Sequence, residues 1–199
     1  MGAHPVTPLV RVPWNEPGIV GKVLDGGAMG IICPMVNSRE EAEALVRYSK
    51  YPPMGARSNG PIRAAMYGET SNYQSTANDE TLAIAMIETQ QAVEHLDEIL
   101  DVKGLAGVYV GPADMAFSYG KTPKLDHEDE FFFEIYRKVV SGCAKRGLYA
   151  GIHCGSGAYA ARMYRMGFRL ATIMNDSNLM AEAARSHIGV ARKESGGLA

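Results

Sequence analysis

The chain has 199 residues, which is enough for one domain with a sizeable core. Its formal net charge of −2 and its lack of a basic run argue against a nucleic-acid-binding protein, and no apolar stretch reaches membrane-spanning length. Three cysteines without C-x-x-C spacing, and an N-terminus without the features of a signal peptide, lead us to expect a cytoplasmic protein.

Short apolar runs alternate with helical segments along the chain. The runs predict strands at residues 9–12, 30–36, 82–88, 107–110, 149–154 and 168–174. Apolar periodicity and helix-start signals predict the main helices at residues 17–25, 40–51, 90–102, 127–146, 157–166 and 176–192. Residues 54–74 are rich in Gly, Ser and Asn and predict a long loop, of a kind that is usually functional, and a short helix should follow at about 73–78.

Two helix ends carry specific signals. Ser38 is expected to cap the second helix, with Glu41 placed to complete a capping box. Gly147 stands where a helix C-terminal glycine belongs.

The strand-helix unit repeats six times, and this alternation predicts parallel βα units. Two architectures are possible, a doubly wound sheet and a (β/α)8 TIM barrel. No glycine-rich dinucleotide-binding fingerprint follows the first strand, and six units are two fewer than a barrel has. We therefore predict a single α/β barrel domain over residues 1–199, apparently lacking the first two βα units.

Two acidic residues follow directly on buried strands. Glu88 ends the run 82–88, and Asp114 comes just after the strand 107–110, at the edge of a parallel sheet where ligands bind. Two ionised carboxylates in apolar surroundings repel each other and lose hydration, and a cation would compensate for both effects. Oxygen ligands of this kind suit Mg²⁺, Mn²⁺ or Co²⁺. The alternative is that each acid simply caps the helix that follows it.

Arg11 interrupts the first apolar strand, and a buried guanidinium needs a carboxylate, a phosphate or an oxyanion. We expect Arg11 in the active site, with a structural ion pair, for example to Glu16, as the alternative. His153, at the end of the strand 149–154, is a candidate for substrate contact or proton transfer near neutral pH. A structural, hydrogen-bonded role is the alternative for this histidine.

Three further features are weaker candidates. Gly155 and Gly157 precede a helix and predict either a small anion nest or a tight turn. Arg57 and Arg63, in the long loop, would bind a substrate carboxylate or pair with a neighbouring subunit.

Several stretches, taken as an ordered set, resemble the metal-dependent class II pyruvate aldolases of the HpcH/HpaI family, the group of 4-hydroxy-2-oxoheptanedioate aldolase. They are LVRVPWNE at 9–16, GIICPMV at 30–36, GARSNGPIRAAMYG in the long loop, Ile87-Glu88-Thr89, and the turn Val110-Gly-Pro-Ala-Asp114. The resemblance implies a (β/α)8 TIM barrel of the phosphoenolpyruvate/pyruvate type, in which the six strands are the third to the eighth.

The resemblance also implies an activity. Glu88 and Asp114 would bind a divalent cation (Mg²⁺, Mn²⁺ or Co²⁺), Arg11 would be catalytic, and the substrate carboxylate would lie against Gly111, Pro112, Ala113 and Asp114. The enzyme would be a lyase that cleaves 4-hydroxy-2-oxo acids to pyruvate and an aldehyde through a metal-stabilised pyruvate enolate, and it would be a homo-oligomer, commonly a hexamer.

Two positions depart from the family pattern. The catalytic histidine of the family follows the second barrel strand and so would precede Leu9, and Met86 stands where many members have Gln. Two other functions are compatible with the same residues. One is an acyl-CoA-type, citrate-lyase-like enzyme on the same barrel, and the other is a truncated, non-catalytic barrel fragment.

Overall fold

The computed structural model describes residues 6–67 and 72–196, and six parallel strands form one sheet in the order β1-β2-β3-β4-β5-β6. The strands are β1 (Leu9–Arg11), β2 (Gly30–Cys33), β3 (Leu82–Ile87), β4 (Gly107–Val110), β5 (Tyr149–Cys154) and β6 (Leu170–Ile173). The helices are α1 (Pro17–Asp25), α2 (Arg39–Ser49), α3 (Ile62–Tyr67), α4 (Tyr73–Glu80), α5 (Gln90–Glu94), α6 (Leu96–Leu100), α7 (Pro112–Ser118), α8 (Glu130–Arg146), α9 (Gly157–Met166) and α10 (Asp176–Glu194).

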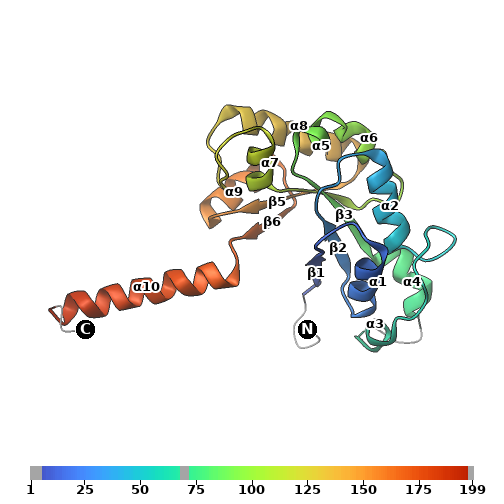
Figure 1. The fold of residues 1–199 in the computed structure, drawn as a ribbon, viewed down its shortest axis with the longest axis horizontal. Helices are drawn as coiled ribbons and strands as arrows, with labels where there is room; N and C mark the ends of the chain where they lie inside the picture. Colours follow the sequence, from blue (N-terminus) through green and yellow to red (C-terminus); the bar gives the residue numbers. More distant parts are fainter. Residues whose placement is uncertain (1–5, 68–71, 197–199) are drawn as a thin grey trace.

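Each strand pairs only with strands next to it in the chain, and the order never reverses. A doubly wound sheet would reverse its strand order at a switch point, so the barrel prediction is confirmed over a doubly wound fold. Figure 1 shows the six strands curling as part of a barrel wall, with helices along the outer side.

The two faces of the sheet carry different clusters. On the outer face, strand residues such as Ile31, Ala85 and Val108 pack with apolar residues of the helices. The second cluster consists of strand residues alone, namely Ile32, Ile84, Met86 and Tyr109. We call the side that carries this second cluster the inner face. Because both faces of the central strands carry buried apolar residues, these strands read as nearly continuous apolar runs, which is why the sequence predicted them well.

The Ser38 and Gly147 caps are confirmed, whereas the capping box is altered, because Glu41 bonds the amide before the N-cap residue and not that of Ser38 itself. The Ser38 hydroxyl accepts a hydrogen bond from the amide of Glu41 at 3.3 Å, while the Glu41 carboxylate accepts one from the amide of Asn37. Gly147 ends α8 with a left-handed φ of 68°, a conformation that favours glycine.

Three helix predictions need correction. The segment 54–74 contains the six-residue helix α3, which was missed because its apolar residues Ile62 and Met66 are exposed and show no periodic core face. Residues 68–71 of the predicted loop lie outside the described residues. The helix predicted at 90–102 is two short helices, because His95 leaves helical geometry between them. Helix α8 begins at Glu130, after an N-cap at Asp129, and not at His127.

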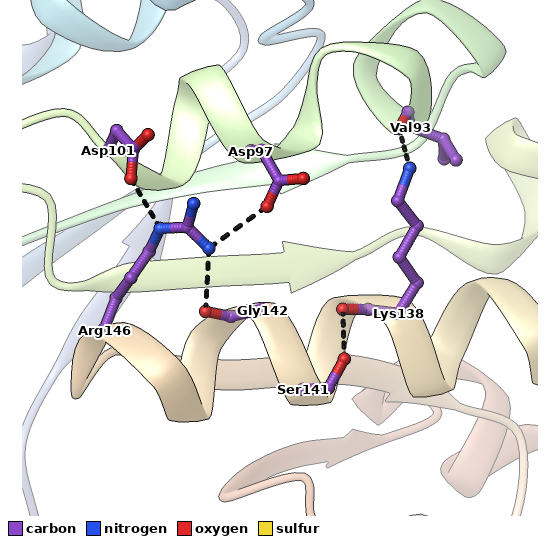
Figure 2. Close-up of polar contacts among 7 residues, drawn as sticks. All are labelled: Val93, Asp97, Asp101, Lys138, Ser141, Gly142 and Arg146. Carbon is purple, nitrogen blue, oxygen red and sulfur yellow. Dashed lines mark hydrogen bonds and ion pairs between the residues drawn. The ribbon is translucent and has the colours of Figure 1, made fainter.

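Polar contacts fasten α8 to the helices before β4. As Figure 2 shows, Arg146 pairs with Asp97 at 3.1 Å and with Asp101 at 2.6 Å, and Lys138 donates to the carbonyl oxygen of Val93 at 3.1 Å. These contacts add to the apolar packing between α6 and α8, the helices that precede and follow β4 in the chain.

Helix α10 differs from the other long helices. It has no buried residue, and Figure 1 shows it extending away from the sheet. Within the residues that the structure covers, no helix has both the length and the apolar character needed to cross a membrane.

Candidate active site

Glu88 is buried at the carboxyl end of β3, with 1% of its surface exposed. Its Oε1 accepts a hydrogen bond from the amide of Met35 at 2.8 Å, whereas its Oε2 has no hydrogen-bond partner in the described part of the chain. A Cβ added to Gly111 would lie 2.5 Å from Oε2. The glycine therefore leaves room for a carboxylate with one buried, unpaired oxygen.

Asp114 lies in the first turn of α7 and is exposed. Burial raises the pKa of the Glu88 carboxyl, and the negative charge of Asp114 raises it further. The Met35 amide and the charge of Arg11 act in the opposite direction on this pKa. The structure thus brings Glu88, Asp114 and Arg11 within electrostatic reach of one another.

The capping interpretation fails for Glu88. The N-cap of α5 is Thr89, whose hydroxyl accepts a hydrogen bond from the amide of Ala92 at 3.0 Å. Helix α7 begins after Gly111 without a side-chain cap, so Asp114 caps no amide there. Within the described residues, the Oε2 atom of Glu88 and the carboxylate of Asp114 are therefore available to a ligand.

The donor set fits a hard divalent cation. Among the described residues no group of three or more His, Cys, Asp or Glu side chains comes together, so this site offers two carboxylates. Two carboxylates with open positions for water and substrate are typical of Mg²⁺-like ions. The observation that supports this fit is the buried Oε2 of Glu88, for which residues 6–67 and 72–196 offer no hydrogen-bond partner.

The turn between β4 and α7 supplies amide groups beside the two acids. The amide of Gly111 already donates to the carbonyl oxygen of Ile87 at 3.3 Å, and Pro112 has no N–H. The amides of Ala113 and Asp114 have no acceptor among the residues described, as expected for the first turn of a helix. They are therefore the two donors available to an anion at this turn.

Arg11 ends β1 and is exposed, so the prediction of a buried guanidinium is wrong for this chain. The reason is that β1 is an edge strand, which pairs only with β2. The alternative ion pair with Glu16 is also wrong, because the Glu16 carboxylate accepts from the amides of Gly18 and Ile19 and caps α1.

His153 is half-buried on β5, and its Nδ1 lies 2.7 Å from the hydroxyl of Thr172 on β6. Tyr109 forms a hydrogen bond with the same hydroxyl. Burial lowers the pKa of His153, and the charge of Asp126 partly opposes this effect.

The anion nest predicted at Gly155 and Gly157 is occupied by a side chain of the protein itself. The Asp126 carboxylate accepts hydrogen bonds from the Gly155 amide at 2.6 Å and from the Ser156 hydroxyl at 2.8 Å.

The structure does not bring Arg57 or Arg63 to Glu88. Both follow α2 and precede β3, so they lie at the end of the sheet where strands begin. Arg57 is buried, pairs with Asp25 at 2.7 Å and stacks 4.5 Å above the ring of Tyr51. Arg63 is exposed on α3, and both arginines line a cavity of about 770 Å³ beside α1.

Sequence reasoning missed three residues of the site. Met35 donates its amide to Glu88 from a left-handed backbone conformation with φ of 56°, which is rare for this residue type. Tyr109 and Thr172 form the hydrogen-bonded chain that ends on His153. Strand alternation alone did not reveal them, because the common face of Tyr109 and Glu88 follows from the pairing of Met86 with Tyr109 between β3 and β4.

The sequence profile of the family described as HpcH/HpaI aldolase/citrate lyase matches residues 1–182. The chain belongs to this family. Its members are named as lyases and aldolases, which agrees with an enzyme that breaks carbon–carbon bonds.

Named relatives support this assignment. A hydroxypyruvate/pyruvate aldolase of Rhizorhabdus wittichii is 40% identical over 186 residues, which cover 93% of this chain and 73% of the relative. A 4-hydroxy-2-oxo-heptane-1,7-dioate aldolase of Escherichia coli is 33% identical over 185 residues, covering 92% and 70% of the two chains. The solved structure of a family protein from Burkholderia cenocepacia superposes with a TM-score of 0.86 at 30% identity, covering 96% of this chain and 75% of that one.

Proposed function

We propose that the protein is a divalent-metal-dependent aldolase that cleaves 4-hydroxy-2-oxo acids to pyruvate and an aldehyde. The observation that carries this proposal is the buried Oε2 of Glu88, which has no hydrogen-bond partner among the described residues and whose carboxyl feels the charge of Asp114 at the carboxyl edge of the sheet. The name of the Escherichia coli relative, a 4-hydroxy-2-oxo-heptane-1,7-dioate aldolase, supports the substrate class.

The proposed roles follow from the chemistry of each group. Glu88 and Asp114 would hold Mg²⁺, Mn²⁺ or Co²⁺, which when bound would act as a Lewis acid toward the oxygen atoms of the 2-oxo acid. The amides of Ala113 and Asp114 would donate hydrogen bonds to the substrate carboxylate at the positive end of α7. The guanidinium of Arg11 would offset the negative charge of the pyruvate enolate that forms when the carbon–carbon bond breaks.

We also propose that the functional form is a homo-oligomer. Helix α10 supports this proposal, because it buries no residue in the described chain and exposes Leu179, Met180, Ile188 and Val190. Large exposed apolar patches in monomers are rare and commonly mark protein interfaces.

The test is pyruvate release from 4-hydroxy-2-oxo acids, measured with Mg²⁺ or Mn²⁺ and again after chelation. Glu88→Ala and Asp114→Ala should each lower turnover by more than about a hundredfold, since even outer-shell partners of a metal typically cost about 10–100-fold. Arg63→Ala, at the opposite end of the sheet, is the control and should keep wild-type turnover. Turnover that survives chelation, or that persists in both acid variants, would contradict the proposal and shift attention to acyl-thioester substrates.

A further inference from the structure

One row of residues crosses the inner face at the carboxyl edge of the sheet. The ladders pair Ile87 with Val110 and Val110 with Ile152, so the next residues on these strands, Glu88, Gly111 and His153, stand level with one another. The ladder between β5 and β6 extends this row, because it pairs His153 with Thr172.

The side chains of this row share the inner face. Glu88 stands two residues after Met86 and Gly111 two residues after Tyr109, and both of these belong to the inner cluster. Since strand residues alternate between faces, His153 faces the same side as Glu88. Two strand spacings separate their backbones, which amounts to about 10 Å.

Gly111 stands between the two side chains in the row and contributes no side chain of its own. The Glu88 carboxylate and the Met86 methyl group lie beside it, within 3.0 Å of where an added Cβ would stand, whereas the Tyr109 ring of the same strand is directed across β5 at Gly151. The backbones of β3 and β5 are about 10 Å apart, and this separation suits a small molecule of a few carbon atoms.

His153 is held in place by a chain of hydrogen bonds that begins at Tyr109. The Tyr109 ring crosses β5 at Gly151, where an added Cβ would lie 2.8 Å from its Cδ2 atom. The phenol hydroxyl then reaches the hydroxyl of Thr172 on β6, which in turn lies 2.7 Å from Nδ1 of His153. The absence of a side chain at Gly151 thus permits this chain of hydrogen bonds to form.

The oxygen atoms of Tyr109 and Thr172 fit donation in either direction. We infer the direction in which the Tyr109 hydroxyl, which stays protonated because burial raises its pKa to about 12, donates to Thr172. The single hydrogen of the Thr172 hydroxyl is then directed to Nδ1 of His153. A neutral imidazole that accepts at Nδ1 carries its hydrogen on Nε2, and this N–H has no acceptor within the described ranges.

We propose that the Nε2–H of His153 donates a hydrogen bond to an oxygen atom on the aldehyde half of the substrate, so that the enzyme prefers aldehydes bearing a hydroxyl or carboxylate group over alkyl aldehydes. The inference rests on the proposed function. The pyruvate half would occupy Glu88, Asp114 and the first turn of α7, which leaves the far end of the substrate opposite His153. Tyr109 and Thr172 are positioning residues for this donor.

The test is aldol addition of pyruvate to matched aldehydes. Glycolaldehyde and propionaldehyde differ by a hydroxyl in place of a methyl group, and succinic semialdehyde and pentanal form a similar pair for a carboxylate. His153→Leu should lower the preference in kcat/KM for the oxygen-bearing partner about tenfold, the usual size of one lost hydrogen bond. His153→Gln retains an N–H donor and should restore much of the preference, and Thr172→Val should lower it.

The control is His95→Leu, in the turn between α5 and α6, which should keep the wild-type preference. A response in one pair alone would identify which oxygen group is recognised and would support the proposal. Equal loss of kcat/KM for both members of each pair in His153→Leu would overturn it, because a merely structural histidine would affect both aldehydes alike.

Two measurements separate this proposal from the proposed function. Exchange of the pyruvate methyl protons with D₂O needs only the pyruvate half, so a wild-type chain without exchange would count against the proposed function itself. The ¹⁵N spectrum of the His153 ring requires no turnover and would then decide the proposal alone. A neutral ring with hydrogen on Nε2 at pH 7 is expected, and hydrogen on Nδ1 would overturn the proposal.

Discussion

Gly111 leaves the room that the Glu88 carboxylate occupies, because a Cβ added at this position would lie 2.5 Å from Oε2 of Glu88. We expect Gly111→Ala to push this carboxylate out of place and to lower pyruvate release by more than about tenfold, as small displacements of reacting groups do. Circular dichroism should show that the variant folds. The result to be measured is the kcat for 4-hydroxy-2-oxo acid cleavage at saturating Mn²⁺.

The matched control is Gly21→Ala in α1, where an added Cβ meets no atom within 4 Å. Replacing a mid-helix glycine with alanine should stabilise the fold by roughly 0.5–1 kcal/mol and leave turnover at the wild-type level. If Gly111→Ala were as active as Gly21→Ala, the tight contact with Glu88 would have no part in activity.

Single residues were predictable from sequence where their position along a strand decided their role. Glu88 was found because it directly follows a buried run, and the structure places it there. The burial of Arg11 was wrong because exposure depends on which strands pair with β1. Tyr109 and Thr172 were missed because their contact depends on the register across β5 and on the absence of a side chain at Gly151.

At the scale of elements, His127 connects the segment before α8 to α8 itself and to α9. Its ring stacks on Phe132 with 3.9 Å between ring centres, and the Tyr159 hydroxyl donates to its carbonyl oxygen at 2.6 Å. Burial lowers the pKa of His127 below its ordinary 6.5, although the carbonyl oxygen of Pro112 opposes this shift.

The sign of the pH effect follows from this lowered pKa. Below pH 6.5 the unfolded chain binds more protons at His127 than the folded chain does, so the stability is complete above pH 6.5 and falls as the pH drops through the folded pKa. His127→Phe keeps a stacked ring and removes the titration. We therefore expect a shallower decline in the free energy of unfolding, measured by urea denaturation at several values from pH 7.5 to 5.

His153 also has a lowered pKa and contributes to the same window, so the variant should reduce the slope without abolishing it. His153→Gln provides the comparison, because its effect on the slope should add to that of His127→Phe. Parallel pH curves for wild type and His127→Phe would show that the buried ring does not control acid stability.

The elements that the sequence predicted best are those whose pattern is local. Short, mostly apolar runs identified the six strands of the described sheet, and Ser38 and Gly147 marked their helix ends. Helix α3 was missed, since exposed apolar residues give it no periodic face. The interruption at His95 has no local sequence signal that separates it from a continuous helix.

At the scale of the whole molecule, α10 leads to a prediction about assembly. This 19-residue helix carries exposed apolar residues, and Met180 and Ile188, eight residues apart, lie on the same face. We expect a second copy of the chain to cover this face. Met180→Glu combined with Ile188→Glu should therefore lower the molar mass found by light scattering.

Arg185→Glu is the control for the change in charge, because it alters the same helix outside this apolar set. The molar mass of this variant should equal that of the wild type. A wild-type chain that is monomeric at micromolar concentration would contradict the expectation of a homo-oligomer.

The overall architecture was predictable because strict alternation of strands and helices leaves few topologies, and the consecutive strand order agrees with a barrel. The course of α10 away from the sheet was not predictable. The sequence pattern of an amphipathic helix is the same whether its apolar face packs on its own domain or on another chain. The location of the protein in the cell remains a prediction from composition alone.

The consecutive order of the strands also bears on how the chain folds as it is synthesised. Each strand from β2 onward finds its hydrogen-bonding partner in the segment that left the ribosome just before it. No strand of the described sheet has to wait for a segment made much later, because each new strand is added to the edge formed by the strand before it. Parallel pairing is usually slow because distant segments must meet, but here growth from one end turns it into a series of short steps.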